Sequence, residues 1–238
     1  MQLDLTTLYK APYTPPAAGS TITSPITRQE QLRQQLKSRW PEAVRNLNQT
    51  QTLVFPTGLP ELDQLLPLQG IPYGQLIEIT GGVSSGKTSL LFRLMAGMSS
   101  ANKRIAYVDF SRSFFPEAAQ ASGVNLARLV VVNAAGKAVP DGIRTGEILL
   151  REHRAHVVAF DLVSAKHALP IGLLHRLRLR TVKSKGLVIF LTQDNSDIIP
   201  ASMASLRLTT ERLEDDSYRL HITKSRICPE GTRLGVSL

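Results

Sequence analysis

The stretch Gly81-Gly82-Val83-Ser84-Ser85-Gly86-Lys87-Thr88 decides how the rest of the sequence is interpreted. It fits the Walker A pattern, G-x4-G-K-[ST], and it lies between an apolar run and an amphipathic segment, the strand–loop–helix context that this pattern requires. Glycines let successive backbone N–H groups turn toward phosphate oxygens, and the start of the following helix adds positive dipole. The stretch therefore predicts a phosphate-binding loop. The alternative interpretation is a glycine-rich turn with a solvated lysine.

Each residue type in this loop has an expected role in holding a nucleoside triphosphate. Lys87 would reach the β- and γ-phosphates with its ammonium group, and the Thr88 hydroxyl would be a ligand of Mg²⁺. The other expected nucleotide-binding residues of the loop are Gly81, Gly82, Ser84, Ser85 and Gly86.

Two further polar residues lie where apolar runs end. Asp161 closes the run that begins at Val157, a position from which a carboxylate holds Mg²⁺ directly or through water. Gln193 follows the run Leu187–Thr192, where an amide either senses the γ-phosphate or serves as a helix cap or loop residue. The phosphate loop upstream favours Mg²⁺ binding by Asp161, and both interpretations of Gln193 stay open.

Working outward from the loop, short apolar runs alternate with helical segments. The runs are apolar on both faces, as is typical of parallel strands covered on both sides, and they are Gln75–Thr80, Arg104–Phe110, Leu129–Asn133, Val157–Leu162 and Leu187–Thr192. The helices expected between them are Gly86–Ser99, Phe114–Ala121, Asp141–Arg154 and Ile171–Lys183. This alternation predicts an α/β fold with a mostly parallel sheet flanked by helices. Residues Ser205–Glu214 and Tyr218–Arg226 add a C-terminal antiparallel hairpin.

The composition is that of a globular protein with a basic balance. Of the 238 residues, 42% are hydrophobic and 20% are charged, and the net charge of +9 suggests an anionic partner. Residues 1–25 are expected to form a flexible arm, residues 26–52 an N-terminal helix and linker, and residues 53–238 the nucleotide-binding core. The single cysteine, Cys228, excludes a disulfide framework. No secretory signal or membrane span is recognisable, so a cytoplasmic location is expected.

A basic segment lies within the last predicted helix. Arg176, Arg180 and Lys183 are spaced at i, i+4 and i+7, which places them on one face of that helix. Two interpretations are open. The face is simply solvated, or it contacts the phosphate backbone of DNA or the acidic groups of a partner protein.

Residues 53–235 resemble the RecA recombinase family. The phosphate loop is the most specific part of the resemblance, and weaker matches follow in the same order at Tyr107-Val108-Asp109, Gly123-Val124, Thr192-Gln193 and Lys224-Ser225-Arg226. The resemblance implies a RecA-like core that binds ATP with Mg²⁺. It also implies that Gln193 lies where the family couples nucleotide to DNA, and that Lys224 and Arg226 are basic subunit-interface residues of a self-associating protein.

The sequence departs from the family where ATP hydrolysis and DNA binding are concerned. The family's catalytic glutamate, two residues after the aspartate of the second strand, falls on Ser111, and the adenine-contacting positions fall on Phe115 and Ala118. A serine cannot act as a carboxylate base, so hydrolysis is expected to be weak or absent. The first DNA loop is reduced to Leu162–Pro170, and the second to Asp194–Ala201, which carries no lysine or arginine.

This combination is similar to the ImuA group of RecA-like proteins, which act in bacterial translesion mutasomes with ImuB-like polymerase homologues. The resemblance implies an accessory protein of DNA repair and the SOS response, located in the bacterial cytoplasm at the nucleoid. One alternative is an active DNA-dependent ATPase or recombinase that forms filaments, favoured by the intact phosphate loop and opposed by Ser111. Another is a RecA-like regulator of cell division, which would have no evident need of an intact phosphate loop.

Overall fold

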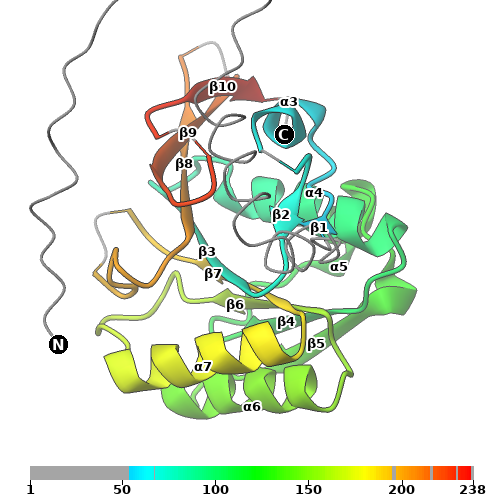
Figure 1. Ribbon diagram of the computed structural model, residues 1–238, viewed down its shortest axis with the longest axis vertical. Helices are drawn as coiled ribbons and strands as arrows, with labels where there is room; N and C mark the ends of the chain where they lie inside the picture. The colour runs from blue at the N-terminus through cyan, green and yellow to red at the C-terminus, as the bar shows by residue number, and fades with distance from the viewer. Residues whose placement is uncertain (1–53, 67, 195–196, 215–216, 229, 237–238) are drawn as a thin grey trace, which may run out of the picture. The chain divides into compact units, whose positions relative to one another are not determined.

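An eight-stranded sheet runs through the part of the chain that the structure describes (Figure 1). This computed structural model describes residues 54–238 apart from 67, 195–196, 215–216, 229 and 237–238. The arm predicted for residues 1–25 and the helix and linker predicted for residues 26–52 lie outside the described residues.

The strand that precedes the phosphate loop lies inside this sheet. The strand order is β10-β9-β8-β3-β7-β6-β4-β5. β3 pairs in parallel with β7 on one side and with β8 on the other, and β9 and β10 continue the sheet in antiparallel pairing. The bounds are β3 Gln75–Gly81, β4 Ile105–Asp109, β5 Leu129–Asn133, β6 Val157–Asp161, β7 Leu187–Leu191, β8 Leu206–Arg212, β9 Tyr218–Ser225 and β10 Arg233–Val236.

Helices cover both faces of the sheet. They are α3 Pro60–Leu65, α4 Lys87–Ser100, α5 Pro116–Ala121, α6 Val139–Arg151 and α7 Ile171–Lys183, with a short 3-10 helix, η2, at Leu126–Arg128. On one face, Leu90 of α4 shares a core with Ile77 and Ile79 of β3. On the other, Leu174 of α7 shares a second core with Leu76 of β3. Figure 1 shows α6 and α7 side by side on this second face.

The fold class predicted from the sequence is confirmed, and the differences lie at the margins of the sheet. β5 is its last strand, and Val130 and Val131 are 50% and 43% exposed, although their run predicted a strand covered on both faces. A short aliphatic run does not distinguish a central strand from an edge strand, because position in the sheet depends on pairing partners distant in sequence. β10 and a small antiparallel pair, β1 (Val54–Phe55) with β2 (Ile71–Pro72), are additions that the pattern does not predict.

None of the helices in the described part of the chain combines the length and the apolar character needed to cross a membrane.

Candidate nucleotide-binding site

The phosphate loop connects the end of β3 to the first residue of α4. Glycine is required at both ends of it. A Cβ atom at Gly81 would lie 2.3 Å from the Ser85 hydroxyl and 2.6 Å from the Thr210 carbonyl oxygen. Gly86 caps α4 in the left-handed region, with φ of 83°, which a side chain would disfavour. The loop is further fixed by a 2.9 Å hydrogen bond between the hydroxyls of Ser85 and Thr210.

Lys87 lies inside this loop at its expected position. It is the first residue of α4, and its ammonium group donates a 2.7 Å hydrogen bond to the Gly82 carbonyl oxygen. Burial lowers the pKa of Lys87, and the carboxylates of Asp161 and Asp194 act in the opposite direction. The ammonium group is therefore held where phosphate oxygens would enter, in the field of two acids from neighbouring strand ends.

A cavity of about 240 Å³ opens over the loop, with Ser84, Ser85, Gly86, Lys87, Thr88 and Ser89 on one side. Its other side is formed by Arg212 at the end of β8 and by Tyr218 at the start of β9. Sequence reasoning did not identify either residue. The only available signal was that they flank the predicted hairpin turn, and the parallel pairing of β8 with β3 is what brings that turn to the phosphate loop.

Asp161 ends β6, next to the end of β4 in the register that pairs Asp161 with Asp109. Its carboxylate is 3% exposed and accepts hydrogen bonds from Tyr107 Oη at 2.9 Å and Ser113 Oγ at 2.7 Å. The Val163 amide donates a third, at 3.2 Å. Burial and the Asp161 charge raise the pKa of Tyr107, so the phenol stays a donor. These bonds fix the orientation of the acid that was predicted to hold Mg²⁺.

The donors on this side of the sheet fit Mg²⁺ bound together with a nucleotide. Thr88 offers an exposed hydroxyl on the first turn of α4, and Asp161 offers one carboxylate. Among the described residues there is no group of three or more His, Cys, Asp or Glu side chains that would hold a metal by themselves. Mg²⁺ is commonly bound by one or two protein ligands plus substrate phosphates and water, so this donor set suits it only with phosphates present.

Ser111 lies just beyond the carboxyl end of β4, in a segment that folds around Asp109. Asp109 accepts hydrogen bonds from the amides of Ser111 at 3.0 Å, Ser113 at 3.2 Å and Phe114 at 2.9 Å. The exposed Ser111 hydroxyl lies 3.4 Å from the Ser164 hydroxyl, which follows β6. A hydroxyl thus occupies the place at which the family resemblance expects a carboxylate.

Gln193 lies next to the beginning of the phosphate loop. The Thr192 amide donates to the Ile79 carbonyl at 3.0 Å, and the Asp194 amide donates to the Gly81 carbonyl at 3.1 Å. The backbone after β7 therefore follows β3 to its end, with Gln193 between these two bonds. This geometry is compatible with an amide that responds to the γ-phosphate.

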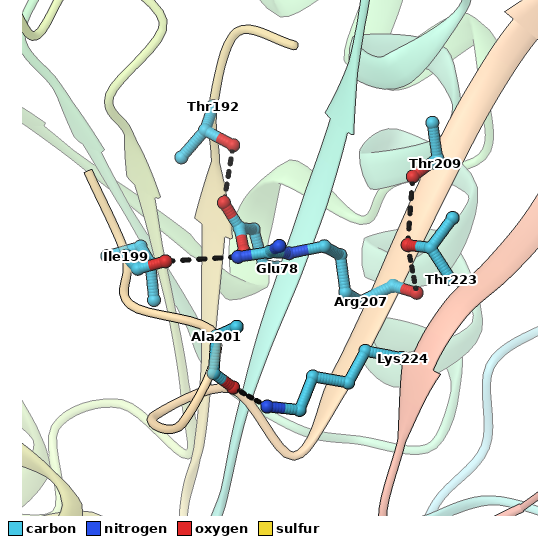
Figure 2. A network of polar contacts seen from close by, with 8 residues as sticks. All are labelled: Glu78, Thr192, Ile199, Ala201, Arg207, Thr209, Thr223 and Lys224. Atoms are coloured by element: carbon cyan, nitrogen blue, oxygen red, sulfur yellow. Dashed lines mark hydrogen bonds and ion pairs between the residues drawn. The ribbon is translucent and has the colours of Figure 1, made fainter. Parts of the chain in front are cut away.

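A polar network lies behind the loop, around Glu78 in the middle of β3 (Figure 2). The Glu78 side chain is 1% exposed and forms a 2.6 Å ion pair with Arg207 of β8. It also accepts a 2.8 Å hydrogen bond from the Thr192 hydroxyl. Arg207 in turn donates to the Ile199 carbonyl at 3.0 Å. The network joins the phosphate-loop strand, the end of β7 and the segment that follows it.

The two residues expected at a subunit interface make contacts within the chain. Lys224 donates to the Ala201 carbonyl, as Figure 2 shows, and Arg226 donates to the Ser202 carbonyl. Both basic groups thereby hold the segment between β7 and β8.

The structure does not bring the basic residues of α7 to the phosphate loop. Arg176, Arg180 and Lys183 belong to a helix that packs on the opposite face of the sheet from α4. The Arg176 guanidinium donates three hydrogen bonds to the Glu147 carboxylate of α6, with N–O distances of 2.8 to 3.1 Å. Arg176 is therefore paired within the chain, while its side chain stays 52% exposed on the predicted helix face.

Comparison with known proteins identifies the family. The model of the RecA N-terminal domain matches residues 31–169, which are 139 of the 238 residues. Protein RecA of Caldanaerobacter subterraneus is 32% identical over 179 residues, covering 63% of this chain and 50% of that protein. Protein RecA of Streptomyces ambofaciens is 33% identical over 116 residues, covering 47% of this chain and 30% of that protein. The chain thus spans half or less of these two relatives.

A solved structure shows the same fold at low sequence similarity. A KaiC-like protein of Pyrococcus horikoshii superposes with a TM-score of 0.61 at 15% identity, covering 77% of this chain and 94% of the other. The matched family model covers more than half of the chain and includes the phosphate loop, Gly81 to Thr88. The chain belongs to the RecA N-terminal domain family.

Proposed function

We propose that the protein binds ATP with Mg²⁺ and acts as an ImuA-like accessory protein of DNA repair and translesion synthesis, with weak or no ATP hydrolysis. The observation that carries this proposal is the pairing of a complete phosphate loop with a serine at the catalytic position. Lys87, Thr88 and Asp161 lie at the carboxyl ends of the parallel strands, and Ser111 lies at the same end of the sheet.

The binding part of the proposal rests on charge and on donors already in place. Lys87 would neutralise the β- and γ-phosphates, and the loop amides and the start of α4 would donate to their oxygens. Thr88 and Asp161 would hold Mg²⁺, which supplies the positive charge that a bound triphosphate needs. Arg212, on the far wall of the cavity, adds a further cation near the phosphates.

We expect weak hydrolysis because the two nearby aspartates, Asp109 and Asp161, already accept several hydrogen bonds. Asp109 accepts three amide hydrogen bonds, and Asp161 accepts bonds from a phenol, a hydroxyl and an amide. Both carboxylates are thus committed to structure or to Mg²⁺. A serine hydroxyl at position 111 is uncharged and does not take a proton from the attacking water as a carboxylate would.

The proposed partners follow from the resemblance to ImuA. They are ImuB-like polymerase homologues and further copies of this protein, at the bacterial nucleoid. The basic face of α7 would contact either DNA phosphates or the acidic groups of such a partner. The second candidate function is an active DNA-dependent ATPase or recombinase, which the complete phosphate loop favours equally. Turnover of ATP distinguishes the two.

Equilibrium titration with Mg-ATP tests the binding step. Lys87→Ala removes the fixed charge on the phosphates and should weaken affinity at least about tenfold, since hydrogen bonds to charged groups contribute about 1.5–3 kcal/mol. Lys137→Ala is the matched control, because this exposed lysine follows β5, four strands away from β3. Equal affinity of the Lys87 variant and the parent would refute the proposed site.

Steady-state turnover with and without single-stranded DNA tests the second step. The parent should be slow in both conditions, and Ser111→Glu should raise the rate, since a general base contributes typically about 10²–10⁴-fold. Ser164→Glu places a carboxylate on the neighbouring strand end and serves as the control. DNA-stimulated turnover by the parent at the rate of a recombinase would favour the second candidate function.

A further inference from the structure

A groove of about 230 Å³ lies between α6 and α7, on the face of the sheet opposite α4. Figure 1 shows these two helices side by side. The groove is lined by Arg144, Glu147, Ile148 and Arg151 of α6 and by Arg176 and Arg180 of α7. Four of its six lining residues are arginines contributed by both helices, and this concentrates positive charge in one concave surface.

The charges of the groove are only partly balanced within the chain. Glu147 is held by Arg176, and Arg151 pairs with the adjacent Glu152 at 2.7 Å. Arg144 and Arg180 have no acidic partner among the residues that the structure describes. Two guanidinium groups from facing helices are thus available to one anionic ligand. Arginine matches carboxylate and phosphate oxygens with two parallel N–H groups, and Arg176 already shows this geometry with Glu147, through Nε to Oε1 and Nη2 to Oε2.

The groove also exposes apolar surface. Ile148 lies between Arg144 and Arg151 along α6 and is 42% exposed. Leu179 and Val182 of α7 do not line the groove, and they add exposed apolar surface elsewhere on the same helix, at 64% and 54% exposure. None of the six lining residues is aromatic. Proteins that bind single-stranded nucleic acid stack bases on aromatic side chains, whereas protein interfaces combine arginine with apolar residues.

We propose that the α6–α7 groove docks an acidic, amphipathic segment of a partner protein. Carboxylates of that segment pair with Arg144 and Arg180, and an apolar side chain of the segment packs on Ile148. Charge complementarity selects the occupant, because two guanidinium groups of the groove lack an acidic partner among the described residues, beside an exposed Ile148 and with no aromatic residue in the lining. The inference rests on the proposed accessory function for the nature of the partner, and it assigns a surface and a chemistry to that partner.

The test measures fluorescence anisotropy of labelled probes with the full chain. The probes are a short peptide of glutamate and leucine, the same peptide with glutamine in place of glutamate, and oligo(dT). The groove variant is Arg144→Glu with Arg180→Glu, and Ile148→Ser removes the apolar floor. The matched control is Arg154→Glu with Arg178→Glu, which makes the same change in charge outside the groove lining.

The glutamate–leucine peptide should bind the parent and the control pair alike and should bind the groove variant at least about tenfold more weakly. Ile148→Ser should weaken the same peptide several-fold, and the glutamine peptide should bind weakly to every protein. Equal losses in the groove and control pairs, or a loss of oligo(dT) binding with the peptide unaffected, would overturn the proposal. Mg-ATP affinity measured on the same samples separates the two hypotheses, since it depends on Lys87 and not on the groove.

Discussion

Glu78 places a carboxyl group in the middle of β3, between the fully buried side chains of Ile77 and Ile79. Burial is the largest influence and raises its pKa, while Arg207 and the Thr192 hydroxyl lower it. A buried ion pair of this kind is costly to break, because removing one partner leaves an uncompensated charge. The pair therefore ties β3 and β8 to each other directly behind the phosphate loop.

We predict that Glu78 makes the free energy of unfolding depend on pH. Its pKa in the folded state lies above the ordinary value of 4.5, so the penalty for its buried charge is fully present above the folded pKa. The penalty is relieved as pH falls through the folded pKa toward about 4.5. Urea unfolding at several pH values should show that, as pH falls, the free energy of unfolding of the parent rises relative to that of Glu78→Gln. A difference that is independent of pH would contradict the prediction.

Residues of the site differ in how far the sequence could predict them. The phosphate loop is contiguous, so Gly81 to Thr88 could be identified from their spacing alone. Arg212 and Tyr218 could not, because they reach the cavity only through the pairing of β8 with β3. Similarly, the spacing of Arg176 in α7 predicted its face but could not show that Glu147 of α6 lies opposite.

At the scale of elements, α4 packs closely against the segment before α3 because each of them has a glycine at the contact. A Cβ atom at Gly97 would lie 2.6 Å from both the Cα and the N of Gly58. Gly58 itself has φ of 73°, a conformation that glycine adopts without strain. The absence of side chains at both positions allows the helix and the loop to approach at backbone distance.

We predict opposite effects for two glycine-to-alanine changes in helices. Gly97→Ala should lower the free energy of unfolding by about 1–3 kcal/mol, because the new methyl group meets backbone atoms that cannot move aside cheaply. Gly172→Ala in α7 meets nothing within 4 Å and should raise stability by about 0.4–1 kcal/mol. Chemical denaturation of both variants and of the parent measures these changes in the free energy of unfolding. No change for Gly97→Ala would show that the contact between Gly97 and Gly58 is looser than described.

The predicted helices and strands agree with the structure where an unbroken aliphatic run or a helical spacing of apolar residues marks the element. Leu129–Asn133 and Ile171–Lys183 have the predicted bounds. β10 is short and follows a glycine turn, so its sequence carries little pattern, and its pairing with β9 is what makes it a strand. Long-range pairing, rather than local propensity, determines the elements that the sequence does not reveal.

At the scale of the whole molecule, β5 leaves one end of the sheet without a further strand among the described residues. Such an edge presents unpaired backbone groups, and here it also exposes Val130 and Val131. Exposed apolar edge strands favour pairing with another chain. The β5 edge therefore combines two features that favour self-association.

We predict that Val130→Lys reduces concentration-dependent association of the protein. A charged side chain on an edge strand opposes pairing with a second copy, and an exposed position should tolerate the change with little loss of stability. Sedimentation velocity over a range of concentrations measures the effect. Ile171→Lys, at a residue that is 57% exposed on α7, is the control. An equal effect of both changes would point to general charge repulsion instead.

The pairing of β3 with β8 also limits how early the sheet can form while the chain is being synthesised. Arg207 follows Glu78 by 129 positions, and ribosomes add about 5–20 residues per second. For about 6 to 26 seconds, β3 therefore lacks β8 and Glu78 lacks its guanidinium, and for most of that time β3 also lacks β7, which begins at Leu187. We expect the nascent protein to need protection by chaperones during this interval, and the phosphate loop to become competent only after β8 has emerged.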